Sequence, residues 1–309
     1  MGEEQMGKER QEAGYFDWES QYALYRGVWE SRQKKGQNPS EAAWDGRAAD
    51  WKKELSKDPA FFGGLDRRVR ETVSFLRGRG LLQPGSTVAD IGCGPGHFAA
   101  AFAETAAHIA ALDISGGMLE MAREYAAAQG VKNVSFVQAD FSSMDVGRAG
   151  WERAFDLVFA ALTPAVASVE DLEKLMGISR GFCFNSSFVR WEDGLERRIG
   201  RELYGREPRP LRGRDDWFYA CFNLLWIMGY YPETRYYCTD SEVRVRADED
   251  EARYYARCFS PDMSADAGET ERIYRYLQGI AGEDGMISFR EEKWYGWLLW
   301  DVRKKTVRR

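Results

Sequence analysis

One stretch, residues 86–98, constrains the fold of this chain more than any other. Its sequence is STVADIGCGPGHF, in which residues 88–91 predict a short buried strand and the alanine-rich segment 98–107 predicts a helix. Three glycines between them let the backbone turn sharply and approach a ligand without a Cβ in the way: Gly92, Gly94 and Gly96. A strand, a glycine loop and a helix in this order predict a nucleotide-type site at the carboxyl end of the strand.

The residues around the glycines restrict which kind of nucleotide the loop could bind. A dinucleotide site needs glycine or alanine where this chain has His97, and no Gly-Lys-Ser/Thr follows, which excludes a phosphate-binding P-loop. Asp90 lies two residues before the first glycine, so the pattern is acid-x-Gly-x-Gly-x-Gly. An acid at this place would repel a pyrophosphate and attract a cationic ligand. The alternative is a glycine turn with a purely structural role in a βα unit.

The pattern VADIGCGPG resembles the first motif of the class I methyltransferases that depend on S-adenosylmethionine (SAM). SAM has no phosphate and carries a cationic ammonium and a sulfonium, which suit a neighbouring acid. The resemblance extends in order over about residues 85–187. It implies SAM as the cofactor, S-adenosyl-L-homocysteine (SAH) as the product, and direct in-line transfer of the methyl group to an acceptor.

An acid follows each of the next two predicted strands. Residues 108–113 end at Asp113, where an acid accepts from both ribose hydroxyls, although NAD enzymes use the same placement. Residues 133–138 precede Asp140, and the resemblance implies that Asp140 accepts from the adenine amine while the next residue's backbone contacts the ring. A turn cap is the alternative for Asp140, because two serines follow it.

The helix that opens at Ser115 resembles the family's S-x-x-M-L-x-x-A segment, so Met118 either packs on the adenine or belongs to the core. We expect the following residues to bind the cofactor: Asp90, Gly92, Cys93, Gly94, Gly96, His97, Asp113, Ile114, Met118, Asp140, Phe141 and Ala160.

The acceptor side is less defined. Residues 155–166 are the fourth predicted strand and its exit loop, and this loop, 161–164, should face the transferred methyl group. It carries Thr163-Pro164 where methyltransferases of nucleobases and glutamine carry (Asn/Asp)-Pro-Pro-(Tyr/Phe). This departure disfavours those acceptors. The segment Trp44-Asp-Gly-Arg-Ala resembles one found upstream of the glycine motif in small-molecule methyltransferases, although such aromatic residues more often serve packing. The expected acceptor-binding residues are Trp44, Arg47, Thr163, Pro164, Ser186 and Trp217.

A general base is unnecessary if the acceptor is a thiol, a neutral amine or an enolate. If a base is used, the candidates are His97, Tyr22 and Tyr25, and the sequence does not choose between them. His97 has an alternative role as a helix-start residue that contacts the cofactor, since the helix dipole disfavours its cationic form.

The predicted fold is α/β: a seven-stranded, mostly parallel, Rossmann-like sheet with an antiparallel last strand, flanked by helices. A helical segment precedes the core, and a helical insertion separates strands five and six. We expect a disordered tail at 1–14, an N-terminal helical cap at 15–80, a SAM-binding core at 81–190, an acceptor cap at 191–232, and the rest of the sheet at 233–309.

Composition limits the partners. The 309 residues carry a net charge of −6, which disfavours a nucleic-acid substrate, and no apolar run has the ~18–20 residues that span a bilayer. The five cysteines lack a C-x-x-C spacing and two histidines offer little for a metal, so we expect reduced thiols, no metal site and a cytoplasmic location.

The sequence therefore predicts a SAM-dependent methyltransferase that acts on a small-molecule acceptor, without a nucleic-acid or membrane partner, as a monomer or homodimer. The alternatives are a protein methyltransferase and a non-catalytic SAM-binding protein. The sequence does not give the acceptor, the oligomeric state or the pathway.

Overall fold

The computed structural model describes residues 17–31, 40–57, 63–206, 215–259 and 266–306. The expected disordered tail, 1–14, lies outside these residues. Contacts divide the chain into two compact units. The first unit comprises Met1–Asn185, Tyr219–Glu233 and Leu299–Arg309, and the second comprises Ser186–Phe218 and Thr234–Leu298. The predicted functional division into cap, core and insertion stays a prediction.

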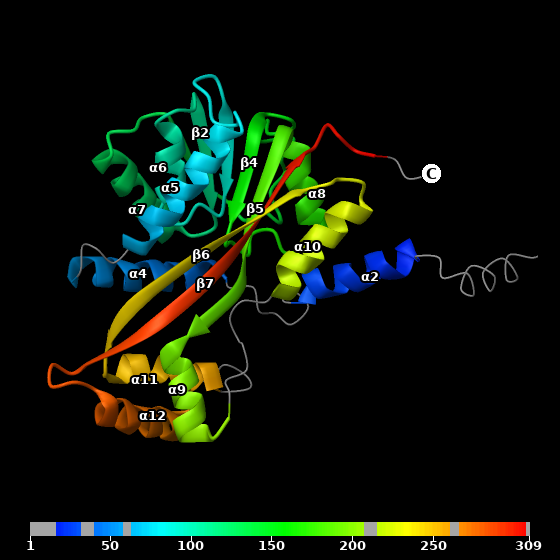
Figure 1. The fold of residues 1–309 in the computed structure, drawn as a ribbon. Helices are drawn as coiled ribbons and strands as arrows, with labels where there is room; N and C mark the ends of the chain where they lie inside the picture. The colour runs from blue at the N-terminus through cyan, green and yellow to red at the C-terminus, as the bar shows by residue number, and fades with distance from the viewer. Residues whose placement is uncertain (1–16, 32–39, 58–62, 207–214, 260–265, 307–309) are drawn as a thin grey trace, which may run out of the picture. The chain divides into compact units, whose positions relative to one another are not determined.

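The strands form one seven-stranded sheet in the order β3-β2-β1-β4-β5-β7-β6, with an antiparallel β7 (Figure 1). This arrangement, with helices on the flanks and between β5 and β6, confirms the predicted fold class. The strands are β1 (Thr87–Ile91), β2 (His108–Asp113), β3 (Val134–Gln138), β4 (Phe155–Ala161), β5 (Ser179–Asp193), β6 (Glu233–Arg246) and β7 (Met286–Asp301).

The strand order sets the place of the site. β1 pairs in parallel with β2 on one side and with β4 on the other, and β2 pairs in parallel with β3. The chain therefore runs outward from β1 through β2 to β3 and returns to β4 across the first strand. In open α/β sheets, ligands bind outside the carboxyl ends of the strands at such a switch point. The carboxyl ends of β1 and β4 are thus where a ligand is expected.

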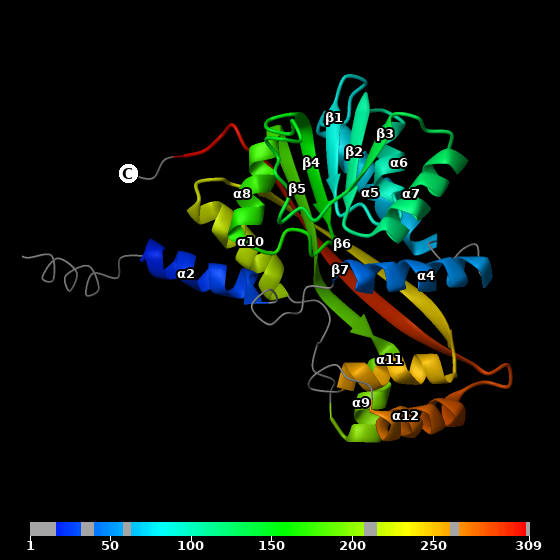
Figure 2. The same ribbon diagram turned by 180° about the vertical axis from the view of Figure 1, so that it is seen from behind.

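Helices cover both faces of the parallel strands. α5 and α6 lie in front of them in Figure 1, and α8 lies in front of β4 and β5 in the view from behind (Figure 2). The helices of the first unit include α2 (Trp18–Trp29), α4 (Glu41–Lys57), α5 (Gly63–Gly78), α6 (His97–Ala103), α7 (Gly116–Ala128), α8 (Val169–Ile178) and most of α10 (Asp215–Ile227). The helix after the glycine loop is shorter than its alanine content predicts, since α6 ends at Ala103.

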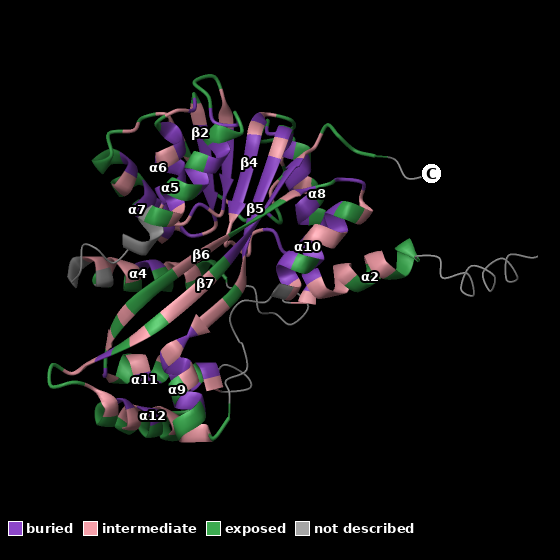
Figure 3. Cartoon of the chain, in the orientation of Figure 1, coloured by how far each residue is buried: buried purple, intermediate pink, exposed green. Residues whose placement is uncertain are grey.

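The inner parallel strands β1, β2 and β4 are mostly buried, as Figure 3 shows for β2 and β4, whereas β3 at the edge of the sheet is not. Phe159 of β4 is the centre of an aromatic cluster in the first unit. Its ring lies 4.8 Å from that of Phe98 and 4.9 Å from that of Phe102, both on α6, and it stacks at 4.9 Å on Phe184 of β5. Such pairs add about 0.5–1.5 kcal/mol each beyond area burial. They hold α6, and with it the end of the glycine loop, on the central strand.

The second unit has a core of its own. It contains α9 (Gly194–Tyr204), α11 (Glu249–Phe259) and α12 (Ala267–Ile280), together with parts of β5, β6 and β7. Side chains from these helices are fully buried together, among them Ile199, Tyr255 and Leu277. β7 begins at Met286, six residues before the expected 292. The sequence did not indicate this first part as strand because exposed and covered residues alternate there, without the apolar run of the second half.

We predict that the glycine loop tolerates a side chain at Gly94 better than at Gly96. Gly96 has φ +80°, and a Cβ there would lie 2.7 Å from the Cβ and 3.0 Å from the Cα of Ala122. Gly94 has φ +53°, and a Cβ there would meet no atom within 4 Å. Gly96→Ala should therefore lower the free energy of unfolding by roughly 2–4 kcal/mol, and Gly94→Ala by only ~1 kcal/mol.

Urea unfolding of both variants measures this difference. Adding Ala122→Gly to Gly96→Ala should recover part of the loss, because it removes the Ala122 Cβ, the nearer of the two overlapping atoms. Equal destabilisation by the two glycine substitutions would contradict the close approach of α7 to the loop.

Candidate cofactor-binding site

The glycine loop is fixed to the neighbouring strand. The backbone N–H groups of Gly92 and Cys93 both donate to the carbonyl of Leu112 in β2, at 2.8 and 2.9 Å. All three loop glycines have positive φ, which side chains rarely allow. The loop therefore has a defined shape that is held by the end of β2, one residue before Asp113.

Asp113 joins this loop to the next helix. Its Oδ2 accepts from the Gly94 N–H at 2.8 Å, and its Oδ1 accepts from the Ser115 N–H at 2.9 Å. The residue is 8% exposed, and burial raises the pKa of its carboxyl although the backbone N–H groups act in the opposite direction. Each carboxylate oxygen accepts more than one hydrogen bond. Asp113 thus keeps capacity for ligand hydroxyls while it holds the loop in place.

Asp90 is the second buried acid of the site. It lies in β1, is 2% exposed, and its Oδ2 has no hydrogen-bond partner among the described residues. Burial, and then the negative charge of Asp113, raises the pKa of the Asp90 carboxyl to about 8, against the lowering effect of the Ala99 N–H. A buried acid with an unsatisfied oxygen is costly unless it pairs with a cation. The residues present therefore fit the cationic amino-acid end of SAM.

The glycine loop is covered by other residues at Gly92 but has free space beside Gly94. A Cβ on Gly92 would overlap the side chain of Thr163, so the loop packs directly against the segment that follows β4. Leu162, the residue before Thr163, has φ +53°, a strained conformation for a non-glycine residue. At Gly94 the same construction meets nothing. The structure thus brings Thr163 to the glycine loop and leaves room beside Gly94.

Four more residues were expected to bind the cofactor near the glycine loop, and they differ in burial and in their polar groups: Cys93, His97, Ile114 and Ala160. The Cys93 thiol is buried, and burial raises its pKa, so it is no nucleophile. Ala160 is fully buried in β4, and Ile114 is half-buried, with its carbonyl accepting from Gln138 Nε2 at 3.4 Å. The His97 ring is buried against Tyr125, with ring centroids 4.3 Å apart. The role of His97 as a helix-start residue that contacts the cofactor stays a prediction.

Met118 belongs to α7 and points its side chain into the contact between α7 and α4. It is 1% exposed and packs with Ala48 and Met121, against partly buried Trp44 and Trp51 of α4. The Met118 and Trp44 side chains thus both take part in packing, and a contact of either with cofactor or acceptor stays a prediction. Arg47, on the same helix, is exposed.

Asp140 and Phe141 lie at the start of the loop that follows β3. Asp140 is exposed, and its Oδ1 accepts from the N–H and the hydroxyl of Ser142 at 2.9 and 2.8 Å, so it does cap a turn. The Phe141 side chain is fully buried. Lys174 of α8 donates to the carbonyls of Phe141 and Ser142 at 3.0 and 2.5 Å, and its Nζ lies 5.6 Å from the Phe141 ring centre. These contacts fix the backbone that is expected to meet the adenine.

The N-terminal helix α2 is anchored just after the exit loop of β4. Trp29 Nε1 donates to the Ser168 carbonyl at 3.2 Å, and Glu30 accepts from the Val169 N–H at 3.4 Å. Ser168 and Asp171 form a capping box at the start of α8. The half-buried Thr163 and Pro164 therefore lie in a loop that is held at both ends.

The two tyrosine candidates for a base lie on α2. A hydrogen bond with Tyr219 at 3.4 Å, and then burial, raises the pKa of Tyr25, while burial raises the pKa of Tyr22. Phenols with raised pKa values are poorer bases near neutral pH. The choice of a base stays open. Ser186 and Trp217 are buried in the second unit, and their role with an acceptor stays a prediction.

Sequence reasoning missed two residues that shape this site. Lys174 gave no signal in the sequence. Asp45 lies in the segment Trp44-Asp-Gly-Arg-Ala, whose resemblance to small-molecule methyltransferases indicates Trp44 and Arg47 but not Asp45. Asp45 Oδ1 accepts from the Ser115 hydroxyl at 2.6 Å and from the Gly117 N–H at 3.0 Å.

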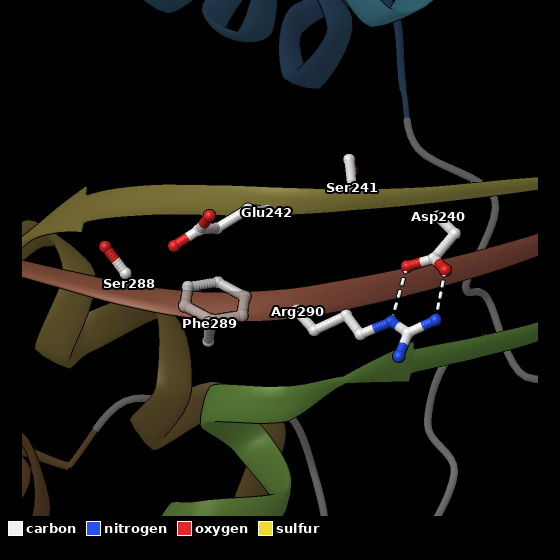
Figure 4. A pocket seen from close by; sticks show the side chains of 6 residues that line it. All are labelled: Asp240, Ser241, Glu242, Ser288, Phe289 and Arg290. Carbon is white, nitrogen blue, oxygen red and sulfur yellow. Dashed lines mark hydrogen bonds and ion pairs between the residues drawn. The ribbon is translucent and has the colours of Figure 1, made fainter.

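The second unit has a hollow on β6 and β7, shown in Figure 4. Arg290 donates to both carboxylate oxygens of Asp240, so the main charges there neutralise each other. The hollow is lined by Asp240, Ser241, Glu242, Ser288, Phe289 and Arg290. It shows no buried unsatisfied group of the kind found at Asp90.

The core of the chain matches a known family. Residues 88–179 match the family model described as a methyltransferase domain. The chain therefore contains a methyltransferase domain, as the glycine motif predicted.

Two curated relatives match parts of the chain. An uncharacterized protein of Haemophilus influenzae is 30% identical over 130 residues, which are 40% of this chain and 46% of the relative. The 23S rRNA (uracil(1939)-C(5))-methyltransferase RlmD of Klebsiella pneumoniae is 38% identical over 87 residues, which are 28% of this chain and 19% of the relative. The chain thus spans less than half the length of either relative.

Solved structures with a similar fold include a putative methyltransferase from Bacillus halodurans, with a TM-score of 0.46 and 16% identity over 76% of this chain and 99% of that chain. Magnesium protoporphyrin IX methyltransferase from Synechocystis, solved with bound SAH, has a TM-score of 0.43 and 16% identity over 76% of this chain and 83% of that chain. Likeness at this level carries no argument about the reaction. None of the helices in the described ranges has the length and apolarity that a bilayer crossing demands.

We predict that Asp90→Asn changes the pH dependence of stability. A carboxyl whose pKa is raised on folding stabilises the folded state less as pH rises from its unfolded value, near 4, to about 8. The variant lacks this ionisation. Its free energy of unfolding, relative to that of the unaltered protein, should therefore increase by roughly 4–6 kcal/mol between pH 4 and pH 8.5.

Urea unfolding at a series of pH values measures the change. Asp145→Asn, the same substitution at an exposed acid, serves as the matched control for the general effect of replacing a carboxyl with an amide. A difference for Asp90→Asn that does not change with pH would show that Asp90 is ionised in the protein without ligand.

Proposed function

We propose that this protein is a SAM-dependent methyltransferase that acts on a small-molecule acceptor. The observation that carries the proposal is the pair of buried acids at the glycine loop. Asp113 holds the loop through Gly94, and Asp90 presents a buried carboxylate oxygen without a partner among the described residues. A cation-bearing nucleoside would satisfy both groups at once.

Each part of the cofactor would meet a different element. Asp90, at the end of β1, would pair with the ammonium group, and the open backbone at Gly94 would lie along the amino-acid chain. Asp113, at the end of β2, would accept from the ribose hydroxyls. Asp140 and the backbone at Phe141, after β3, would hold the adenine, with Lys174 fixing that backbone.

When bound, SAM supplies a methyl group that is already activated for transfer. The residues of this chain then have to orient the acceptor and exclude water, which is enough for a large rate increase. Thr163 lies beside Gly92, and Pro164 follows it in the chain, so both would border the region where transfer would occur. The Thr163 Oγ1 accepts from the Ala165 N–H at 3.1 Å, so its hydroxyl proton is available to an acceptor group.

Three features favour a small acceptor over a nucleic acid. The net charge is −6, whereas a nucleic-acid substrate calls for a basic face. The (Asn/Asp)-Pro-Pro-(Tyr/Phe) segment is replaced by Thr163-Pro164. Aromatic residues of α2 and α10 meet in the first unit, where the Tyr25 and Tyr219 rings are in edge contact at 5.6 Å. RlmD acts on rRNA by its name, but its likeness covers 28% of this chain and leaves out most of its length.

We predict that Asp113→Ala weakens SAM binding at least tenfold, because it removes the acceptor for the ribose and releases the glycine loop. Isothermal titration calorimetry measures the dissociation constant. Asp145→Ala, at an exposed acid that caps a turn, should leave the affinity within twofold. Unchanged affinity in Asp113→Ala would remove this residue from the site.

We predict that Asp140→Ala reduces the preference for adenine over other bases, because the carboxylate oxygen not engaged with Ser142 is the expected partner of the adenine amine. The measurement compares SAH with its inosine analogue, whose base lacks the amine. The ratio of their dissociation constants should fall severalfold in the variant and stay unaltered in Asp145→Ala. An unaltered ratio in Asp140→Ala would contradict the adenine role.

The reaction itself is tested by incubating the protein and methyl-labelled SAM with fractionated host metabolites and, separately, with host proteins. Label in a metabolite fraction, lost with Asp113→Ala, supports the proposal. Label in proteins alone would favour a protein methyltransferase. SAM binding without transfer to either would favour a non-catalytic SAM-binding protein.

A further inference from the structure

We propose that Asp45 is a positioning residue of the cofactor site, which acts through Ser115 on the acid that would hold the ribose. The proposal rests on the proposed function and deepens it, because it makes α4 a part of cofactor recognition.

A chain of hydrogen bonds links α4 to the glycine loop. Asp45 Oδ1 accepts from the Ser115 hydroxyl at 2.6 Å, and the Ser115 N–H donates to Asp113 Oδ1 at 2.9 Å. The other oxygen of Asp113 accepts from Gly94 N–H at 2.8 Å. Ser115 is fully buried, so its polar groups depend on these partners rather than on water.

Asp45 decides how the Ser115 hydroxyl points. The hydroxyl caps α7 by accepting from the Met118 N–H at 3.0 Å, and it gives its single proton to Asp45. Asp45 also accepts from the Gly117 N–H at 3.0 Å, at the positive end of the same helix. These hydrogen bonds lower the pKa of Asp45, so it is ionised at neutral pH. Without Asp45, the buried hydroxyl loses its acceptor and is free to rotate away from the cap.

The approach of α4 to α7 is close and is supported along the helix. A Cβ on Gly117 would lie 3.1 Å from the Ala48 Cβ and 3.3 Å from Asp45 Oδ1, so a side chain there would push α4 away. Ala48, Met118 and Met121 are buried together between the two helices. Lys52 pairs with Glu120 at 2.9 Å on the exposed side of the same contact. Asp45 is therefore held in its place independently of its hydrogen bonds to Ser115.

The consequence is that the Asp113 carboxylate, which would bind the ribose, is oriented before any ligand binds. Asp113 receives its Oδ1 partner from the first residue of the α7 cap, so a cap that moves takes this oxygen with it. A carboxylate already set in its bound orientation loses less freedom on binding. Loss of Asp45 should therefore weaken binding of ligands that use the ribose hydroxyls, and it should spare ligands that lack them.

The test uses calorimetric titration of the full chain with SAH and with its 2′,3′-dideoxy analogue. Asp45→Ala should weaken SAH binding five- to twentyfold and binding of the dideoxy analogue less than twofold. Asp45→Asn should bind SAH within about threefold of the unaltered protein, because an amide oxygen accepts the same two hydrogen bonds. In an Asp113→Asn background, Asp45→Ala should have less than a twofold effect on SAH.

Lys52→Gln is the matched control, since it weakens the same helix contact without touching Ser115. It should leave SAH binding within twofold, and thermal melts of every variant report folding. Equal losses for SAH and the dideoxy analogue, or a loss in Lys52→Gln as large as in Asp45→Ala, would show that α4 has only a structural role and would overturn the proposal. Unchanged SAH binding in Asp45→Ala would overturn it as well.

The wild-type titration separates this proposal from the proposed function. If the unaltered protein does not bind SAM or SAH, the proposed function fails and this inference fails with it. If the unaltered protein binds both and only the Asp45 variants depart from expectation, the proposed function stands and this inference alone fails.

Discussion

The structure depends on one constraint above all: two acids are buried side by side at the carboxyl ends of adjacent parallel strands. Asp113 is satisfied by two backbone N–H groups, but Asp90 has an oxygen without a partner among the described residues. Burial and the charge of Asp113 both oppose its ionisation. Such an arrangement is unfavourable for a resting fold and favourable for a site that receives a cation.

The rest of the first unit positions this pair. The strand order places β1 at the switch point, the aromatic cluster around Phe159 fixes α6, and the loop after β4 packs on Gly92 through Thr163. α4 and α8 hold the loops after β2 and β3 through Asp45 and Lys174. The site is therefore made from loops whose backbones are tied to helices, which is how a binding site keeps its shape before the ligand arrives.

The sequence was sufficient to predict strands and turns, which depend on neighbouring residues, but not contacts between residues that are far apart in the chain. β2 matched its predicted bounds, and the glycines of the loop make the predicted sharp turn with positive φ, because both features follow from neighbouring residues. The two alternatives for Met118 could not be separated, since a core methionine and a ligand-facing one have the same pattern. Asp45 and Lys174 could not be found, because their partners lie 70 and 33 residues away in the chain. The first residues of β7, 286–291, were missed because covered and exposed positions alternate there without an apolar run.

The most direct test of the buried acid pair is the number of protons released when SAM binds at pH 6.5. It is measured by calorimetry in buffers that differ in their enthalpy of ionisation. The carboxyl of Asp90, with a pKa of about 8, is protonated at this pH and should ionise as the cationic ligand arrives, so that nearly one proton is released. The release should vanish in Asp90→Asn. Binding without proton release, or no binding at all, would contradict the account.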